Sequence, residues 1–420
     1  MSDTDVIIAG AGPAGCSTAW ALARAGVRVL LLDRARFPRE KPCAEYLSPQ
    51  ASGILAQMGA LARCEDAGAA QLAGMIVRAP SGSIMRGDFA ADHGFRGFRD
   101  RGLALRRLLL DAILLDCARA AGACVEEGVR VSDILVDARG RVRGVAAMRG
   151  DGQVCERLAP VVIGADGLRS VVARRLGLAR RARWPRRLAL IAHYRGVSGV
   201  ASHGEMHVER DGYVGIAAVD DGLINVAVVV PAARAHALSG NPAAFVDAWL
   251  AARPHLAPRF LKAQRVSPVR VTGPFASHAR RACAPGAALV GDAADFFDPF
   301  TGEGIYAALR GGELLAPAVV RALDASDNTR ADAELATYDR RRRTEFGGKW
   351  KVERLVGLAV GLPWLMNRAA AALARRKDLA DLFVGVAGDF VPPARVLRPG
   401  YLFPLLAPSW ARGDHAERGS

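Results

Sequence analysis

Paired cysteines are missing from this chain. Its seven cysteines are scattered through 420 residues, and no two of them form a Cys-x-x-Cys pair. This argues against the disulfide framework of a small secreted domain and against the common zinc motifs, and unpaired thiols fit a reducing cytosolic compartment. The cysteines are Cys16, Cys43, Cys64, Cys117, Cys124, Cys155 and Cys283.

Long hydrophobic runs are missing as well. The longest strongly apolar stretch, residues 355–366, contains glycines and a proline, and it is shorter than the ~20 residues that span a bilayer. The chain begins without the basic segment of a signal peptide. We therefore expect a cytoplasmic protein, with association at a membrane surface as the alternative.

Lysine is scarce, because only five of the 57 basic residues are lysines, although the formal net charge is +15. The arginines are spread through amphipathic segments and form no single block, so the sequence predicts no nucleic acid partner. The positive charge favours instead an anionic cofactor, an acidic carrier protein or an anionic membrane surface.

What the chain does contain is a glycine-rich turn near its start. A strand is expected at residues 5–9, then Gly10-Ala-Gly12-Pro13-Ala14-Gly15, a helix over 14–25, and a second strand that ends before Asp33. In such a unit the three glycines permit the turn, the approach of a pyrophosphate and close helix packing, and the helix N-terminus attracts phosphate. The segment therefore predicts a dinucleotide site, with Asp33 on the ribose hydroxyls.

Two later segments extend this pattern. Residues 161–170 run from an apolar strand through Asp166-Gly167 toward a helix. Residues 291–305 hold Gly291-Asp292 and then Pro299-Phe-Thr-Gly302-Glu-Gly304-Ile305 before a long helix. Taken together and in this order, the three motifs resemble those of the p-hydroxybenzoate hydroxylase superfamily of FAD enzymes, over about residues 1–345.

Two segments narrow the resemblance. Lys41-Pro-Cys43-Ala44-Glu45 and the motif that ends at Ile305 are most similar to the geranylgeranyl reductase branch, which usually has glycine in place of Ala44. The resemblance implies that FAD is the cofactor and that NADH or NADPH binds transiently as reductant. It also places Cys43 near the flavin as the one candidate catalytic residue, although a small buried hydrophobe is the alternative interpretation of this cysteine.

The resemblance implies a cofactor site built from both ends of the chain. Asp292 would accept a ribityl hydroxyl proton, and the helix after Gly304 would direct its N-terminus at the flavin ring. Arg107, four residues before Asp111, would contact the phosphates, and a helix cap is the alternative role of Asp166. The predicted cofactor-binding residues are Gly10, Gly12, Pro13, Ala14, Gly15, Asp33, Arg34, Lys41, Arg107, Val131, Asp166, Gly167, Gly291, Asp292, Pro299, Gly302, Gly304 and Ile305.

The succession of patterns predicts a mixed α/β fold in three parts. A discontinuous Rossmann-like FAD-binding domain would comprise residues 1–75, 100–180 and 276–345. An antiparallel-sheet domain for the substrate, residues 76–99 and 181–275, would be inserted into it, because short strands with Asp-Gly turns succeed one another there. Residues 346–420 would form a C-terminal helical region.

The expected sheet departs from the prenyl reductases, which carry a Tyr-x-Trp-x-Phe-Pro pattern. Here the stretch is Tyr213-Val-Gly215-Ile-Ala217-Ala, without the tryptophan and the proline. We expect Tyr213, Gly215 and Ala217 to line a differently shaped substrate pocket, which argues against a prenyl lipid. The Trp-x-Trp-x-Ile-Pro motif of flavin-dependent halogenases is absent as well, which disfavours a halogenase.

Two other features have a structural and a functional interpretation. His203 and His207 are expected to face solvent from one strand, and we predict no metal site. In the tail, basic residues at 349–354 precede the apolar stretch 355–366. A lid over the substrate pocket is favoured, and peripheral membrane contact through the C-terminal helices is the alternative.

The sequence therefore predicts an FAD-dependent oxidoreductase. The favoured activity is NAD(P)H-dependent hydroxylation of a bulky aromatic or polyene substrate, either a small molecule or one attached to a carrier. The first alternative is reduction of an isolated C=C bond, as in the geranylgeranyl reductase branch. An alternative of another class is a flavin electron-transfer or quinone-linked module at a membrane, with the tail as its anchor.

Overall fold

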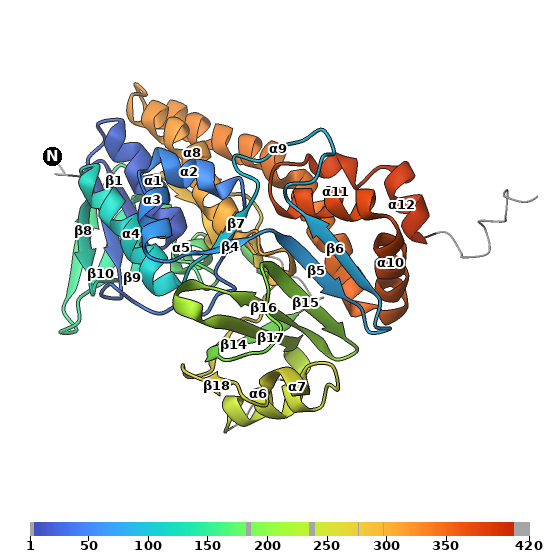
Figure 1. Cartoon of the computed structure of the whole chain (residues 1–420). Helices are drawn as coiled ribbons and strands as arrows, with labels where there is room; N and C mark the ends of the chain where they lie inside the picture. The colour runs from blue at the N-terminus through green and yellow to red at the C-terminus, as the bar shows by residue number, and fades with distance from the viewer. Residues whose placement is uncertain (1–3, 182–185, 235–239, 276, 297, 407–420) are drawn as a thin grey trace, which may run out of the picture.

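The computed structural model describes residues 4–181, 186–234, 240–275, 277–296 and 298–406. A six-stranded sheet in the order β21-β22-β12-β1-β2-β8 forms the core of the first part, at upper left in Figure 1. Its parallel strands are buried apolar runs, as expected for a sheet that is covered on both faces. The strands are β1 (Val6–Ala9), β2 (Val29–Asp33), β8 (Cys124–Glu127), β12 (Val161–Gly164), β21 (Cys283–Ala284) and β22 (Ala287–Leu289).

Three helices cover this sheet and bring the two ends of the chain together. Helix α1 (Pro13–Arg24) packs against both α4 (Arg107–Ala120) and α8 (Gly304–Leu323). The contact between α1 and α8 is close, because Ser17 Oγ donates to the Leu309 carbonyl oxygen at 2.8 Å. Segments almost 300 residues apart in the sequence therefore pack against each other.

An eight-stranded sheet forms the second part, below the first in Figure 1. Strands β5 and β6 from early in the chain join it, with β5 parallel to β15. Strand β5 begins two residues before the domain boundary expected at residue 76. The strands are β5 (Gly74–Arg78), β6 (Ile84–Asp88), β14 (Arg187–Arg195), β15 (His203–Glu209), β16 (Gly212–Ala218), β17 (Ile224–Pro231), β18 (Gln264–Arg265) and β19 (Arg270–Thr272).

Different elements pack against the two faces of this sheet. Leu190, Val214 and Val228 belong to a core with α6 (Pro242–Ala251), and α7 (Ala257–Phe260) lies on the same side. Their neighbours Ile191, Tyr213 and Val229 belong to a core with the C-terminal helices. This alternation follows from the period of two in a strand and leaves one face available to a site between the two parts.

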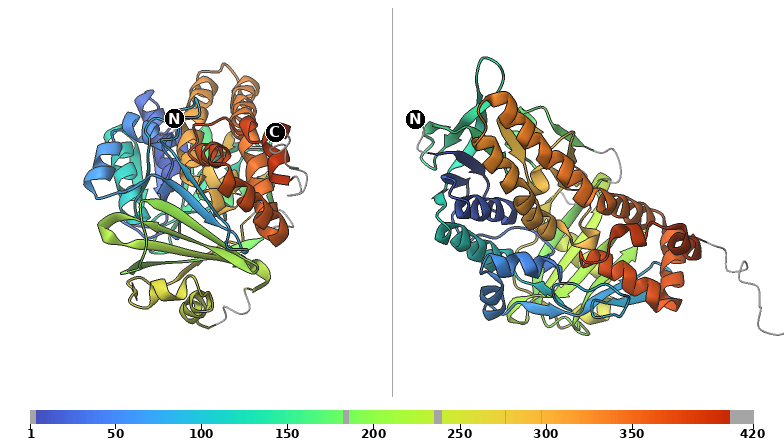
Figure 2. Two further views of the ribbon diagram at one scale, coloured as in Figure 1. Left: turned by 45° about the vertical axis from the view of Figure 1, so that its right-hand side comes forward. Right: turned by 90° about the horizontal axis from the view of Figure 1, so that it is seen from above.

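The C-terminal helices are continuous with the first part. Helix α9 (Asn328–Gly361) has 34 residues, and it packs on α8 before it reaches the second sheet, as the view from above in Figure 2 shows. The domain boundary expected at residue 345 therefore falls inside one helix. Helices α10 (Pro363–Arg375), α11 (Lys377–Ala387) and α12 (Pro399–Leu406) follow, and α10 and α11 pack against β6.

Shorter elements link the parts and complete a mixed α/β fold, which confirms the expected class. Among the described residues, no single helix has the length and composition needed to cross a membrane, although α9 and α10, bent by 113°, pass this test as a pair. The remaining helices and strands are α2 (Ala51–Gln57), α3 (Leu61–Asp66), α5 (Val171–Arg175), β3 (Tyr46–Leu47), β4 (Ala70–Leu72), β7 (Gly102–Ala104), β9 (Arg130–Val136), β10 (Val142–Met148), β11 (Val154–Leu158), β13 (Ala179–Arg181), β20 (Ser277–Ala279) and β23 (Asp295–Phe296).

Candidate active site

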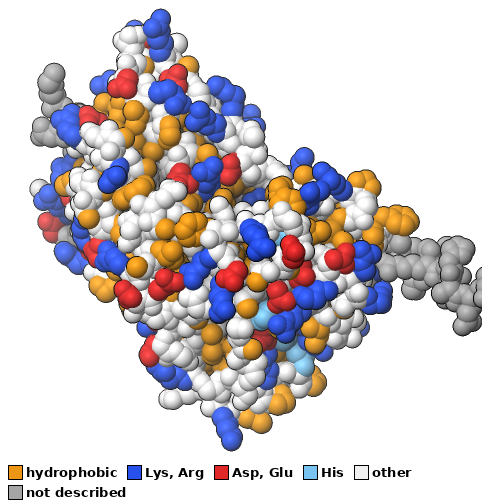
Figure 3. Space-filling model, turned by 45° about the horizontal axis from the view of Figure 1, so that its top comes forward, with side chains coloured by type: hydrophobic (Ala, Val, Ile, Leu, Met, Phe, Trp, Pro, Cys, Tyr) orange, Lys and Arg blue, Asp and Glu red, His pale blue; other side chains and the backbone are white. Residues whose placement is uncertain are grey.

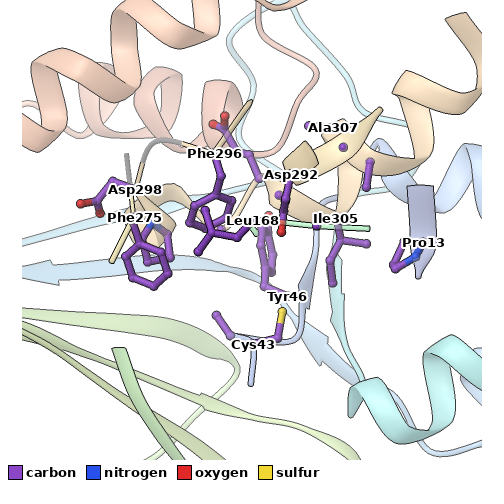
Figure 4. A pocket seen from close by; sticks show the side chains of 18 of the residues that line it. Pro13, Cys43, Tyr46, Leu168, Phe275, Asp292, Phe296, Asp298, Ile305 and Ala307 are labelled. Carbon is purple, nitrogen blue, oxygen red and sulfur yellow. The ribbon is translucent and has the colours of Figure 1, made fainter. Parts of the chain in front are cut away.

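One cavity lies between the two sheets and α9, and it encloses about 1700 Å³ of space, the open solvent at its mouth included. Figure 4 shows Asp292 and Ile305 between Pro13 at one end and Phe275 with Asp298 at the other. Cys43 and Tyr46 lie along the same cavity. The residues that line it come from the glycine turn, the loop at 41–46, the second sheet, the loop at 291–305 and α9.

The glycine turn has the shape that a diphosphate requires. A Cβ atom on Gly10, where φ is +103°, would lie 2.4 Å from the Ala165 carbonyl oxygen, and one on Gly15 would lie 1.8 Å from the Gly10 carbonyl oxygen. By contrast, a Cβ on Gly12 would meet only arginine nitrogens, at 3.7 and 3.9 Å. No side chain caps α1 at Gly12, so its first N–H groups are available beside Pro13 and Ala14, which line the cavity.

Two arginines and one carboxylate lie beside this turn. Arg107 Nε and Nη2 donate to Asp111 at 2.6 and 2.7 Å, and Arg39 Nη1 lies 2.8 Å from the same carboxylate. Burial alone would lower the pKa of Arg107, but Asp111 outweighs it and the pKa is raised. One carboxylate cannot balance two guanidinium groups, so positive charge remains for phosphates. Sequence analysis missed Arg39, although it stands in the basic loop that includes the predicted Arg34.

Three of the predicted cofactor-binding residues, Asp33, Arg34 and Val131, do not line the cavity. Asp33 is buried and accepts backbone N–H groups from Ala11 at 2.7 Å and Ala35 at 2.8 Å. Each carboxylate oxygen keeps a second lone pair, so these bonds leave Asp33 able to bind ribose. Arg34 is exposed, and Val131 is buried in the apolar core on β9. The structure therefore brings none of these three side chains into the cavity, and their contacts with FAD stay predictions.

Asp166 serves a helix, while its neighbour Gly167 faces the cavity. Asp166 Oδ2 accepts the N–H groups of Val171 at 2.6 Å and Val172 at 3.4 Å at the start of α5. This is the capping role that sequence analysis gave as the alternative. Asp166 Oδ1 is buried and has no hydrogen-bond partner among the described residues, and burial raises the pKa of this carboxyl group. A polar group of the cofactor is a suitable partner for that oxygen.

The segment that begins at Gly291 contacts the glycine turn at residues 10–15. A Cβ on Gly291, where φ is +63°, would lie 2.7 Å from the Ala14 Cβ, so the two segments touch. Burial raises the pKa of Asp292, against the charges of Lys41 and Arg107, and burial lowers the pKa of Lys41. Both residues line the cavity together with Ile305. A carboxylate and an ammonium group thus lie where the ribityl chain is predicted.

The loop before α8 marks the position expected for the flavin ring. Pro299, Gly302 and Gly304 line the cavity, and a Cβ on Gly302 would lie 2.6 Å from Tyr46 Cδ1. No side chain caps α8, so the N–H groups of its first turn are open to an anionic acceptor. Sequence analysis missed Tyr46, whose buried hydroxyl has no hydrogen-bond partner among the described residues. The glycines, the open helix end and this hydroxyl fit a flavin.

Cys43 is held by a buried polar network. The Glu45 N–H donates to Cys43 Sγ at 3.3 Å, and Asn225 Nδ2 donates to the Cys43 carbonyl oxygen at 2.9 Å. The Glu45 carboxylate contacts His193 Nε2 and Asn225 Nδ2, both at 2.8 Å. Sequence analysis missed this network, and its signal was a histidine and an asparagine within otherwise apolar strands. Cys43 lines the cavity, and the network fixes its position.

The second sheet supplies the other wall. Tyr213 and Gly215 line the cavity, whereas the structure places Ala217 outside it, in a small apolar cluster with Leu72 and Leu223. Ala217 shares the strand face of Tyr213 but lies beyond the end of the cavity. The Tyr213 hydroxyl donates to Asp298 Oδ1 at 2.7 Å.

The two strand histidines are buried, so the expectation that they face solvent is wrong. His203 Nε2 lies 2.7 Å from Asp88 on the neighbouring hairpin, and His207 Nε2 lies 2.8 Å from Glu205. Arg259 from α7 binds the same glutamate at 2.5 and 2.9 Å. Within the described ranges, no group of three or more His, Cys, Asp or Glu residues could hold a metal ion.

Helix α9 closes the cavity with Phe346, Trp350 and Glu353. One turn before Glu353, Lys349 Nζ lies 3.2 Å from Glu303 and pairs with Asp389, which follows α11. Sequence analysis expected a lid from the tail, and part of α9 does form a wall of the cavity. It missed the acidic residues of this wall, because a helix of mixed charge gives no sign of which residues face inward.

Proteins that are named for different activities are similar to this chain. The FAD binding domain family model matches residues 3–348. The chain is 30% identical to digeranylgeranylglycerophospholipid reductase 2 of Methanopyrus kandleri, over 92% of this chain and 93% of that protein, and 29% identical to menaquinone reductase of Mycobacterium tuberculosis, over 94% and 95%. The flavin-dependent brominase Bmp2 has the same fold, with a TM-score of 0.81, 20% identity, and coverage of 95% and 97%.

The matched segment contains the glycine turn, the Arg107 region and both halves of the FAD motif, and these residues surround one cavity. The chain therefore belongs to the FAD binding domain family, and it is an FAD-dependent oxidoreductase of the p-hydroxybenzoate hydroxylase superfamily, in its geranylgeranyl reductase-like branch.

Proposed function

We propose that this protein reduces isolated carbon–carbon double bonds in a long apolar substrate. The observation that carries this proposal is the apolar wall that the second sheet presents to the cavity, directly across from the loops that fit FAD. The wall consists of Ala189, Ile191, Met206, Ala227, Val229 and Phe275.

An isolated C=C bond offers no polar group for recognition. Its binding depends on removing apolar surface from water, at about 25 cal/mol per Å². The small residues Ala189, Gly215 and Ala227 keep the wall flat, in the region where prenyl reductases carry an aromatic pattern. A flat apolar wall suits an extended hydrocarbon chain. From the sequence alone, the missing tryptophan and proline argued against a prenyl lipid. In the proposed function they correspond to a wider passage, which a prenyl chain can enter.

The relatives point in the same direction. Both reductases named above are similar to this chain over more than nine tenths of its length, and their names give a digeranylgeranylglycerophospholipid and menaquinone as what they reduce. We propose that this protein acts on the same class of substrate. The proposal does not include either of the two named compounds. NADH or NADPH is the reductant that we propose for the flavin.

FAD, when bound, supplies hydride equivalents. The chain's own residues would hold its diphosphate at Gly12, Arg39 and Arg107, its ribityl chain at Asp292 and its ring between Tyr46 and the start of α8. Phe275, Phe296 and Trp350 would exclude water from the substrate end of the cavity. Cys43, fixed by Glu45 and Asn225, would shape the space over the ring.

We further propose that the substrate reaches the protein from a membrane surface at the cytoplasmic side. Trp364 and Phe403 are 63% and 69% exposed on the C-terminal helices, and Lys351 and Arg375 are exposed on the same helices. On the face drawn in Figure 3, basic and acidic side chains are interspersed and form no single basic block, so this route rests mainly on the exposed apolar side chains. Binding to anionic vesicles that falls when Trp364 is replaced by Glu would support this route.

Hydroxylation, which sequence analysis favoured, is the second candidate, because the same apolar wall would hold a polyene substrate. One experiment separates the two. The holoprotein is reduced without oxygen and mixed with a dispersed geranylgeranyl lipid. The mass of the product is then measured by mass spectrometry. A gain of two hydrogen atoms supports reduction. A product that forms only with air and NAD(P)H, and gains one oxygen atom, contradicts it and favours hydroxylation.

A further inference from the structure

Three acidic side chains and one cation meet where α8 begins beside α9, and two of the acids line the cavity. The acids are Glu303, Glu353 and Asp389, and the cation is Lys349. Lys349 contacts Glu303 at 3.2 Å and also pairs with Asp389, whose carboxylate has no exposed surface. One ammonium group balances only one of three carboxylates, and uncompensated buried charge is costly.

Within the described residues, Glu353 forms no ion pair, and Lys349 acts on it only through its charge. It lies one helical turn after Lys349, and its carboxyl group forms a hydrogen bond with that of Glu303. Two carboxyl groups can share such a bond only when one of them carries a proton, because an ionised carboxylate is an acceptor alone. Burial and the negative charge of Glu303 raise the pKa of Glu353 well above its ordinary value.

The pair of Glu303 and Glu353 faces the space where chemistry would occur. Glu303 and Glu353 both line the cavity, beside Gly302 and Gly304 of the loop that fits the flavin ring. Phe296 and Trp350 stand next to them in the same wall. Glu353 is half-buried, whereas Glu303 is 5% exposed. Glu353 therefore has the better access to a bound substrate.

We propose that Glu353 is the proton donor to the substrate double bond, with Glu303 and Lys349 as its positioning residues. This proposal rests on the proposed function. The π bond would break as one carbon takes a hydride from the reduced flavin, which would be left oxidised, and the other carbon would form a C–H bond with the proton of Glu353. Glu353 is left as a carboxylate beside Lys349, and it regains a proton from solvent before the next turnover.

The pH dependence follows from the groups that face Glu353. Glu303 from the start of α8 and Asp298 from the preceding loop add negative charge, while Lys349 from α9 opposes them. Asp298 itself is paired with Arg187 from β14 at 2.5 Å, and Asp389 with Lys349. Because the donor must hold its proton, turnover is expected to fall as the pH rises through the raised pKa of Glu353.

The test compares Glu353→Gln with Glu345→Gln in the FAD-loaded full chain. Glu345 lies two turns earlier on α9, pairs with Arg310 at 3.0 Å and is outside the cavity wall, so it is the matched control. Infrared spectra in H2O and D2O report the carbonyl stretch of a protonated carboxyl group without any turnover. We expect this band in the wild type and in E345Q, and its loss in E353Q. A difference spectrum, wild type minus E353Q, that shows no such band overturns the proposal.

The second readout is a single turnover of chemically reduced protein with the geranylgeranyl lipid. We expect E353Q to retain its flavin spectrum and to form saturated product at least ~100-fold more slowly, the range for loss of a general acid. Glu353→Asp, which keeps the proton, is expected to recover part of the rate. A wild type that gives no saturated product overturns the proposed function. A wild type and an E353Q variant that react equally fast overturn only the role of Glu353.

Discussion

The two ends of the cavity bury charge in opposite ways. At the diphosphate end, Arg39 and Arg107 share the single carboxylate of Asp111, so that fixed positive charge is left over. At the substrate end, three carboxyl groups share the single ammonium group of Lys349, so that a proton must be kept. The first arrangement suits a permanent anion, and the second suits a group that gives a proton away.

The diphosphate end depends on backbone geometry before it depends on charge, so the largest effect is expected there. In Gly15→Val the new Cβ would lie 1.8 Å from the Gly10 carbonyl oxygen, a distance that no side chain can adopt. The turn must open, and we expect the purified variant to contain no FAD, measured by its visible absorbance. Gly347→Ala is the control, because nothing lies within 4 Å of its Cβ in the middle of α9. Retention of FAD in G15V would show that this turn does not bind the diphosphate.

Charge at the same end is tested by Arg107→Met. Removal of one partner from a buried ion pair leaves the other uncompensated and typically costs about 3–5 kcal/mol. Arg39 still faces Asp111, so we expect the lower end of this range in the free energy of unfolding by urea, together with weaker FAD binding. Arg63→Met removes an exposed pair with Asp116 and should cost about 0–1 kcal/mol. Equal losses in the two variants would contradict the special role of the Arg107 cluster.

The comparison also explains what the sequence could predict. The glycine turn and the Gly291–Ile305 segment are local patterns, because each glycine meets a steric demand of its own backbone. Residues such as Arg39, Tyr46 and Glu353 are brought to the site only by tertiary contacts, and nothing in their sequence neighbours distinguishes them from exposed or core residues. Ala217 and the two strand histidines were misplaced for the same reason: which part of a strand face is covered depends on segments far away in the chain.

The buried pair of His193 and Glu45 lies between the two ends of the cavity. Its charge can be fixed, as at the diphosphate end, or depend on a proton, as at the substrate end. Burial alone would lower the pKa of His193, but the hydrogen bond and charge of Glu45 outweigh it, against Arg106, and the pKa is raised above 6.5. A raised pKa in the folded state means that the ion pair contributes its full stability below pH 6.5. That contribution is lost as the pH rises through the higher folded value.

We therefore expect the melting temperature of the wild type to fall across this window, and the fall to be absent in His193→Gln, which keeps a hydrogen-bonding group beside Glu45. The effect is expected to be the smallest of the three, because it depends on the titration of one group and removes no backbone geometry and no permanent charge. His255→Gln is the control, because burial and the charge of Arg78 lower the pKa of His255 to about 4, so it titrates below the window. If H193Q and the wild type lose stability in parallel, the Glu45 pair carries no proton-linked energy. Cys43 would then be held by hydrogen bonds alone, and this middle region would resemble neither end of the cavity.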